Sequence, residues 1–240
     1  IKAGVPLVTG VEQAQAFQVI ENVCSEKGAP LYRLGRDFSF QRKGTVKFSY
    51  NGISEGFEDL TLNLTGSHQF SNASIAIASV ELLRGKGFII SNEAVYEGLA
   101  DVAWPGRLET VSEKPMVILD GAHNPAGAEA LAGVIADELE FDKLYLILGI
   151  MADKDIEGII SPLAPLAYEV ILSRPEYERA SPASALLPMA KKYNSNSTAL
   201  ESLKEAIDYA RSRAAGDDLI IISGSLFTVG EARAFLTSKR

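Results

Sequence analysis

Cysteine is nearly absent from the sequence: Cys24 is the single one among 240 residues. One cysteine excludes an internal disulfide and any metal site built from a cysteine cluster, and it favours a reducing compartment. No apolar stretch approaches the roughly 18 residues that span a bilayer, and no charged segment followed by an apolar block opens the chain. We therefore expect a cytoplasmic protein that does not bind membranes.

Clustered positive charge is also missing. The chain has 23 Lys and Arg against 31 Asp and Glu, a net charge of -8, and no basic run is longer than a pair such as Lys191–Lys192. Nucleic acids and anionic membranes are bound by basic patches, so neither is an expected partner. Small molecules are the expected ligands, and we expect a monomer.

Two nucleotide-binding motifs are absent. A dinucleotide-dependent oxidoreductase is expected to carry G-x-G-x-x-G directly after a strand, and no strand predicted here is followed by it. The phosphate-binding loop G-x-x-x-x-G-K-[ST] does not occur in the 240 residues either. The composition, 47% hydrophobic and 22% charged, is nevertheless that of a chain with a substantial core.

The first hundred residues predict two kinds of structure. Apolar runs at 5–10 and 30–35 flank a helical pattern over 12–27, which is a βαβ arrangement. Short alternating segments then predict an antiparallel hairpin, with strands at 45–50 and 59–64 and a turn at 51–56. Two further helices are expected over residues 68–84 and 92–103.

The segment "AWPGR" is the best candidate for a linker. Trp104 precedes a proline, which disfavours helical geometry, and Gly106 frees the backbone just after it. We therefore predict two domains, residues 1–104 and 105–240.

The second domain predicts an alternation of strands and helices. Strands are expected at 115–120, 143–150, 168–172 and 218–223, with a short segment near 197, and helices at 125–140, 155–163, 182–193, 200–214 and 225–237. Apolar strands without polar alternation, joined by amphipathic helices, indicate a mainly parallel sheet covered on both faces. The predicted fold class is α/β and Rossmann-like, with ligands at the carboxyl ends of the strands.

One turn stands out at such an end, "VILDGAHNPAGAEAL", residues 117–131. Asn124 and Pro125 are well placed as N-cap and first residue of a helix, so capping alone accounts for both. Asp120 and His123 are less easily dismissed, because a helix N-terminus attracts anions and an imidazole beside it can hold or protonate a phosphate or carboxylate oxygen. A solvated histidine in a loop is the competing interpretation.

Four other places carry weaker signals. Ser225 follows the strand "IIIS" and is either a helix cap or a hydroxyl in the same cleft as Asp120. Asn72 shares a predicted helix face with His68, and its amide either binds a purine by hydrogen bonds or has no functional role. Arg107, beside the linker, is suited to pair with phosphate when two domains close. The segment "LGIMADKD" reads as a solvated loop.

Taken in order, six segments resemble the folylpolyglutamate synthase/dihydrofolate synthase family within the Mur ligase superfamily. They are "GVPLVTG", "GSHQFSNASIAIASVELL", "WPGRLE", "ILDGAHNPAGAEAL", "LGIMADKD" and "SGSLFTVGEAR". The resemblance implies an ATP-dependent ligase: ATP phosphorylates a carboxylate of dihydropteroate or a folate, and glutamate attacks the acyl phosphate to form an amide. It also implies a C-terminal Rossmann-like domain preceded by the C-terminal part of a P-loop ATPase domain.

Matched residue by residue, the resemblance assigns roles. It implies that Asn72 lies near the adenine, Arg107 at the phosphates and Asp120 at the ribose or the hinge side of the cleft. His123, as the catalytic candidate, and Ser225 match positions associated with the incoming glutamate and the acyl phosphate. Asp120 is expected to contact the substrate as well as the nucleotide. Phe227 stands where many relatives have tyrosine, so a hydrogen bond from that phenol is absent here.

The missing phosphate-binding loop limits what this chain does alone. The resemblance implies ATP and Mg²⁺, but it places that loop and most Mg²⁺ ligands upstream, and no metal site is expected here. The chain also starts without methionine. We expect it to be the C-terminal piece of a longer protein and to be inactive alone. Alternatives are a peptidoglycan ligase that adds an amino acid to a UDP-linked precursor, and a non-catalytic nucleotide-binding domain.

Overall fold

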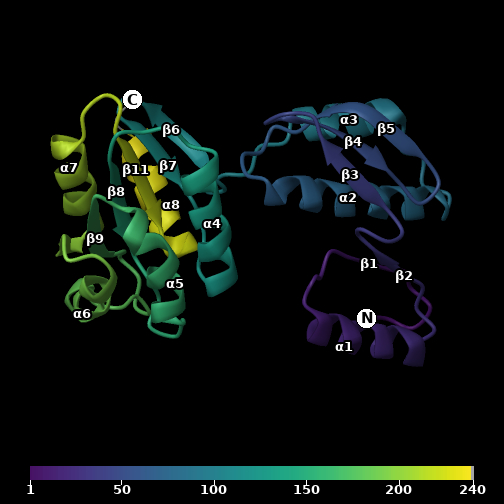
Figure 1. Ribbon diagram of the computed structural model, residues 1–240, viewed down its shortest axis with the longest axis horizontal. Coiled ribbons are helices and arrows are strands. Elements are labelled where there is room, and N and C mark those ends of the chain that lie inside the picture. The colour runs from purple at the N-terminus through teal and green to yellow at the C-terminus, as the bar shows by residue number, and fades with distance from the viewer. Residues whose placement is uncertain (239–240) are drawn as a thin grey trace. The chain divides into compact units, whose positions relative to one another are not determined.

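The computed structural model describes residues 1–238, and the chain divides into two units, Ile1–Ala103 and Trp104–Arg240 (Figure 1). The first, unit 1, contains in chain order β1 (Leu7–Thr9), α1 (Ala14–Glu26), β2 (Leu31–Arg33), β3 (Ser39–Arg42), β4 (Lys47–Asn51), β5 (Gly56–Thr61), α2 (His68–Arg84) and α3 (Asn92–Ala100). Strands β1 and β2 pair in parallel, whereas β3, β4 and β5 form an antiparallel sheet.

Aromatic side chains pack together with aliphatic ones in the core of unit 1. Phe48 of β4 lies edge-on to Phe70 of α2 at 5.4 Å between ring centroids, and both are buried. Edge-to-face pairs of this kind stabilise a core beyond the area that they bury. The antiparallel sheet is therefore fastened to the same helix that presents Asn72.

The second unit, unit 2, holds the longer sheet. It contains β6 (Glu109–Glu113), β7 (Met116–Leu119), α4 (Pro125–Asp137), β8 (Leu144–Leu148), α5 (Ile156–Leu163), the 3-10 helix η1 (Ala164–Leu166), β9 (Glu169–Arg174), α6 (Ala183–Tyr193), β10 (Ser197–Ser202), α7 (Leu203–Arg213), β11 (Leu219–Ser223) and α8 (Leu226–Thr237). The strand order is β10-β9-β8-β11-β7-β6, and every neighbouring pair is parallel except β6 with β7.

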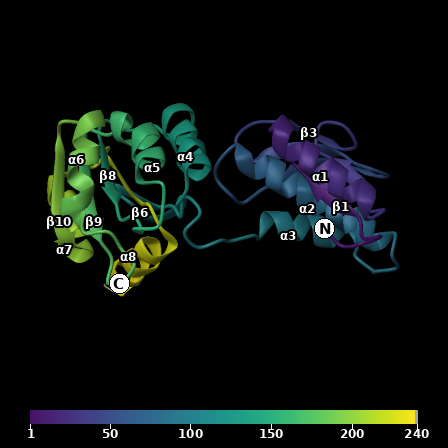
Figure 2. The ribbon, with the colours of Figure 1, turned by 90° about the horizontal axis from the view of Figure 1, so that it is seen from below.

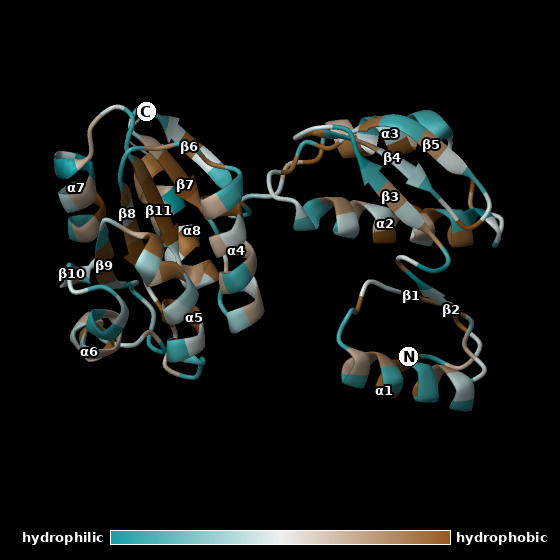
Figure 3. Cartoon of the chain, viewed as in Figure 1, coloured by the Kyte–Doolittle hydropathy of each residue, from teal (hydrophilic) through white to brown (hydrophobic). Residues whose placement is uncertain are grey.

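Helices cover both faces of this sheet. One core joins α4, α5 and α6 to one face, and another joins α7 and α8 to the opposite face; Figure 2 shows α4 and α5 on one side of the strands and α8 on the other. The central strands β8 and β11 are buried along their whole length, and Figure 3 shows their apolar character. A strand buried on both faces has no polar positions to alternate, which explains the continuous apolar runs in the sequence.

The structure confirms the predicted α/β class and the mainly parallel sheet. It also contains strands that the sequence pattern missed. β3 adds a third strand to the predicted hairpin, and β6 adds an antiparallel edge to the large sheet. The segment near Ser197 is a full edge strand, β10. In residues 1–238, no helix is long and apolar enough to cross a bilayer.

Candidate functional site

The turn after β7 begins α4 in the way that its sequence predicts. The side chain of Asn124 accepts a hydrogen bond from the backbone N–H of Gly127 at 2.8 Å, and Pro125 is the first helical residue. A capping bond of this kind contributes about 1 kcal/mol. The N-cap role of Asn124 is therefore confirmed, and capping accounts for both residues.

Asp120, at the end of β7, holds two pieces of backbone. Its Oδ2 accepts from the N–H of Leu108 at 3.1 Å, and its Oδ1 accepts from the N–H of Ala122 at 2.9 Å. Leu108 has φ 47°, a left-handed conformation that is unfavourable for leucine. The carboxylate thus helps to hold an unfavourable turn in the segment that carries Arg107.

That segment packs tightly against the same edge of the sheet. The N–H of Gly121 donates to the carbonyl of Gly106 at 2.8 Å, and the N–H of Gly106 donates to the Glu109 carboxylate at 2.8 Å. Gly106 has φ 74°, and a Cβ there would lie 2.6 Å from Cγ1 of Val229 in α8. Both the conformation and the contact therefore require glycine. Arg107 lies in this turn and is exposed.

His123 is half-buried and orients its ring through the backbone. Its Nδ1 lies 2.7 Å from the carbonyl oxygen of Gly121. A carbonyl oxygen only accepts, so Nδ1 carries the proton of this bond and the neutral ring has Nε2 as its acceptor atom. The turn therefore presents an oriented imidazole with a basic nitrogen.

Ser225 begins α8 and is buried. Its Oγ accepts from the N–H of Thr228 at 3.0 Å and lies 2.8 Å from the Thr228 hydroxyl, which itself donates to the carbonyl of Gly149 at 2.8 Å. Because the Thr228 proton goes to Gly149, the Ser225 hydroxyl donates to Thr228. Ser225 is thus a helix cap joined to the loop after β8, and only 2% of its surface is exposed.

Backbone bonds bring three of these loops together at the carboxyl edge. The N–H of Gly224, after β11, donates to the carbonyl of Ala122, after β7, at 3.1 Å. The N–H of Gly149, after β8, donates to the carbonyl of Ser223 at 3.0 Å. His123 and Ser225 therefore belong to adjoining loops, with Asp120 at the base of one of them.

Asn72 belongs to unit 1, where it is exposed on α2. Its amide donates to the side-chain carbonyl of Gln69 at 3.0 Å, one turn earlier, and Gln69 is itself buried. The contact fixes the direction of the amide group. Its oxygen remains on an exposed helix face, as the sequence pattern predicts.

A cluster joins the loops after β8 and β9 to the start of α8. The interpretation of "LGIMADKD" as a solvated loop is wrong for Ile150 and Met151, which are buried, and the sequence did not indicate the contacts of the cluster. The rings of Tyr177 and Phe227 stack at 3.8 Å with 12° between their planes, and the guanidinium carbon of Arg179 lies 5.5 Å and 6.0 Å from the two ring centroids. The Lys154 ammonium lies 3.3 Å from the carboxylate of Asp153, and its hydrogen bond lowers the pKa of Asp153. The loop "RPEYERA" follows no helix-starting pattern, so only its place after an apolar strand pointed to it.

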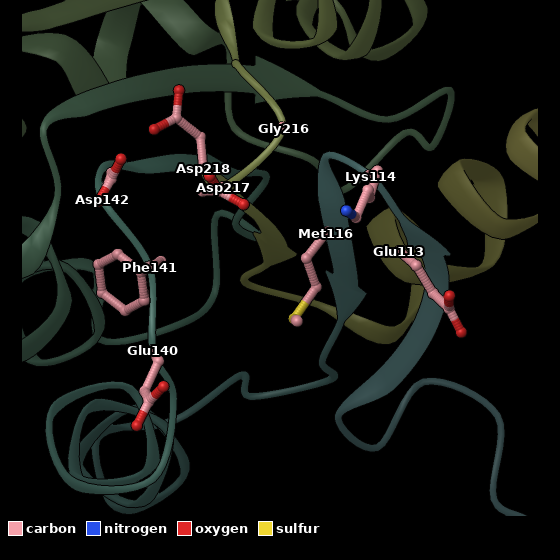
Figure 4. Close-up of a pocket in the computed structure, with 9 residues that line it drawn as sticks. All are labelled: Glu113, Lys114, Met116, Glu140, Phe141, Asp142, Gly216, Asp217 and Asp218. Atoms are coloured by element: carbon pink, nitrogen blue, oxygen red, sulfur yellow. The ribbon is translucent and has the colours of Figure 1, made fainter.

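A cavity of about 540 Å³ lies at the opposite end of the sheet (Figure 4). It is lined where β7, β8 and β11 begin, by acidic groups that include Asp142, Asp217 and Asp218 and by one lysine, Lys114. Asp218 is buried and accepts from the N–H of Ala215 at 2.7 Å, which is a turn-forming role. Parallel sheets bind ligands at the other edge, and residues 1–238 hold no cluster of three metal-ligating groups.

Comparison with known sequences decides the family. The Mur ligase, glutamate ligase domain family matches residues 106–226. Similar proteins include the dihydrofolate synthase/folylpolyglutamate synthases of Bacillus subtilis, 32% identical over 97% of this chain, and of Mycobacterium tuberculosis, 34% identical over 96%. This chain belongs to the dihydrofolate synthase/folylpolyglutamate synthase family of Mur ligases. It spans about half of these two relatives, 55% and 52% of their lengths.

Solved structures of similar fold support the same family assignment. The M. tuberculosis folylpolyglutamate synthase complexed with ADP and AMPPCP has a TM-score of 0.90 and 32% identity, and the match covers 96% of this chain and 55% of that one. FolC of E. coli, in complex with DHPP and ADP, has a TM-score of 0.88 at 28% identity, with coverage of 100% and 55%. The Yersinia pestis enzyme, complexed with AMPPNP and Mn ion, has a TM-score of 0.82 at 27% identity, with coverage of 98% and 54%.

Proposed function

We propose that this chain is the C-terminal part of an ATP-dependent ligase that joins L-glutamate to dihydropteroate, to folates or to both through an acyl phosphate. The observation that carries the proposal is the oriented turn Asp120–Pro125 on a fold similar to relatives that bind ADP and DHPP. Unit 1 is then the C-terminal part of the P-loop ATPase domain and unit 2 the Rossmann-like domain. A cytoplasmic, monomeric protein fits this role.

The nucleotide is proposed to contact Arg107, Asp120 and Asn72. Arg107 is exposed, and within residues 1–238 its guanidinium makes no ion pair, so its charge is available to phosphate. Asp120 holds the backbone of Leu108 next to it, which fixes where that charge is presented. The amide of Asn72 offers a donor and an acceptor of the kind that a purine edge requires.

The proposed reaction uses ATP with Mg²⁺, and we propose that most of the Mg²⁺ ligands lie outside this chain. Residues 1–238 contain no cluster of three or more His, Cys, Asp or Glu side chains that would hold a metal ion. The Y. pestis relative was solved with Mn ion, and we propose that most Mg²⁺ ligands and the phosphate-binding loop belong to the part of the relatives that this chain does not match. No step of the reaction is therefore assigned to a metal held here.

The proposed role of His123 follows from its ring orientation. With Nδ1–H held by Gly121, Nε2 is the atom that accepts a proton or a hydrogen bond. The amino group of glutamate must lose a proton as its nitrogen attacks the acyl carbon and phosphate leaves. Imidazole is the side chain best suited to accept a proton near neutral pH. The proposed role of Ser225 is to position α8, because its hydroxyl is used in the cap.

The test compares two polypeptides. One is the 240-residue chain, and the other is this chain joined to the unmatched part of the B. subtilis relative, called here the fusion. Release of phosphate from ATP is measured with and without glutamate and dihydropteroate or a folate. We expect turnover from the fusion and none from the chain alone. Turnover by the 240-residue chain overturns the inactivity proposal, and a folded fusion without glutamate-dependent turnover overturns the ligase proposal.

A further inference from the structure

The turn that carries Arg107 is held on both sides by carboxylates. Asp120 accepts from the N–H of Leu108, the residue after Arg107, at 3.1 Å. Oε2 of Glu109, the first residue of β6, accepts from the N–H of Gly106, the residue before Arg107, at 2.8 Å. Two negative charges therefore lie close to an exposed arginine that, within residues 1–238, makes no ion pair.

A second arginine pairs with one of these carboxylates. Nε of Arg233, on α8, lies 2.9 Å from Oε1 and 3.1 Å from Oε2 of Glu109 and donates to both. The two residues are 124 positions apart in the sequence. Their ion pair is partly shielded from water, because the Glu109 side chain is 21% exposed and that of Arg233 is 44% exposed. The carboxylate thus has a backbone N–H and a guanidinium as partners, and the guanidinium is not that of Arg107.

Arg107 is the cation that would replace Arg233 at this carboxylate. In residues 1–238, Oε1 of Glu109 has Arg233 as its partner, so removal of Arg233 leaves this oxygen ready to accept from another guanidinium. The Arg107 side chain starts one residue from the N–H that Glu109 holds. Opposite charges at such short range attract, and a guanidinium matches a carboxylate in geometry. A pair between Arg107 and Glu109 would occupy the charge that a phosphate requires.

We propose that Arg233 is a positioning residue: by pairing with Glu109, it keeps the Arg107 guanidinium available to a phosphate of the nucleotide. The inference rests on the proposed function, which supplies the identity of that ligand. Helix α8 also packs on the turn through Val229, whose Cγ1 leaves no room for a Cβ at Gly106. The segments "WPGRLE" and "GEAR" therefore form one structural unit, in which the arginine of the second keeps the arginine of the first unpaired.

The first measurement uses the 240-residue chain without ligand. NMR follows the exchange of the Arg107 Nε–Hε proton with water, which slows when the guanidinium pairs with a carboxylate. We expect R233Q to slow this exchange about fivefold, the size of an exposed ion pair. E109Q/R233Q should restore the wild-type rate, because the glutamine amide oxygen still accepts from the N–H of Gly106 but carries no charge. R233K, which keeps a cation for Glu109, should exchange as wild type does.

The second measurement is the dissociation constant of ADP for the fusion, obtained by calorimetry. We expect R233Q to weaken ADP binding about fivefold, because Arg107 must leave Glu109 before it binds phosphate. E109Q/R233Q and R233K should both recover wild-type affinity. R211Q is the matched control, since it removes an equal charge from the exposed last turn of α7 and should leave binding unchanged. If Arg233 only holds α8 in place, E109Q/R233Q binds ADP as weakly as R233Q, and that result overturns the inference.

The two measurements separate this inference from the proposed function. Unchanged Arg107 exchange in R233Q, or an R233Q fusion that binds ADP as tightly as wild type, overturns the inference and leaves the ligase proposal intact. A fusion whose ADP binding responds to R233Q as expected, but which has no glutamate-dependent turnover, supports the inference and overturns the ligase proposal. The absence of ADP binding by the folded wild-type fusion removes the nucleotide role of Arg107, and with it the role of Arg233.

Discussion

Glu81 in unit 1 and Asp120 in unit 2 both use a carboxylate to hold loop backbone, but in different surroundings. Glu81 is 5% exposed and accepts from the Tyr50 hydroxyl at 2.5 Å, from the N–H groups of Ile53, Ser54 and Glu55 and from the Ser54 hydroxyl. Asp120 is only half-buried and lies at the edge where ligands of parallel sheets bind. The difference separates a carboxylate that only builds the fold from one that builds a turn and faces a candidate site.

The largest expected effect is the loss of the Glu81 charge. Glu81→Gln replaces one acceptor oxygen by an NH₂ group that faces backbone N–H donors, and we expect unit 1 to lose about 3 kcal/mol of unfolding free energy. Urea unfolding followed through the amide resonances of unit 1 measures it. Glu97→Gln, on the exposed face of α3, is the control. A loss no larger than in this control contradicts the structural role.

Acid pH gives a second way to test Glu81. Burial raises its pKa, but hydrogen bonds from Tyr50 and from three backbone N–H groups outweigh it, and the pKa lies below the ordinary 4.5. A carboxylate with a lowered folded-state pKa stabilises the fold above its unfolded pKa and loses that contribution as pH falls through the folded pKa. The free energy of unfolding of unit 1 in the wild type should therefore fall as the pH drops below about 4.5. In Glu81→Gln the part of this loss that comes from protonation of Glu81 should be absent. If acid lowers the unfolding free energy of both proteins equally, the prediction is contradicted.

Asp120→Asn should have a smaller effect on stability. One oxygen still accepts, so either Leu108 or Ala122 loses its partner, and we expect about 1 kcal/mol of destabilisation of unit 2. Faster amide exchange at Leu108 should accompany it, because this N–H is in the strained turn. Glu129→Gln, exposed on α4, is the control. Unchanged exchange at both amides would show that the carboxylate does not hold the turn.

Asn124→Ala tests the cap alone. It removes the acceptor for the N–H of Gly127 and should cost about 1 kcal/mol of unit 2 stability. Asn124→Ser keeps a capping oxygen and should restore most of the loss. Glutamate-dependent turnover of the fusion should be unchanged in both variants. A large loss of turnover with intact stability would instead give Asn124 a role in the reaction.

Local and long-range features differ in how far the sequence predicts them. The start of α4 follows from Asn124 and Pro125, because the capping contacts are within three residues of each other, and the buried strands follow from uninterrupted apolar runs. Strand β6 was missed because an edge strand with exposed polar residues has no apolar run, and it forms only by pairing with β7.

The candidate site was only partly predictable for the same reason. Asp120, His123 and Ser225 were found because they follow apolar strands, which is a local signal. The stack of Tyr177 on Phe227 joins the loop after β9 to the start of α8, which are far apart in the sequence, and no pattern in either segment indicates it. The use of Ser225 as a cap, rather than as an exposed hydroxyl, depends on Thr228 and on Gly149 in another loop.

His123→Ala should leave stability within about 0.5 kcal/mol of wild type, because a half-buried loop side chain contributes little to the core. Turnover of the fusion should fall about 100-fold if Nε2 accepts the proton of the amino group. His123→Asn sharpens the test, since its amide can still donate to the carbonyl of Gly121 but has no atom at the Nε2 position. Equal loss of turnover in both variants assigns the role to Nε2. Recovery of turnover in His123→Asn would mean that the bond to Gly121 is what matters, and His123 would then belong, like Glu81, to the groups that only build the fold.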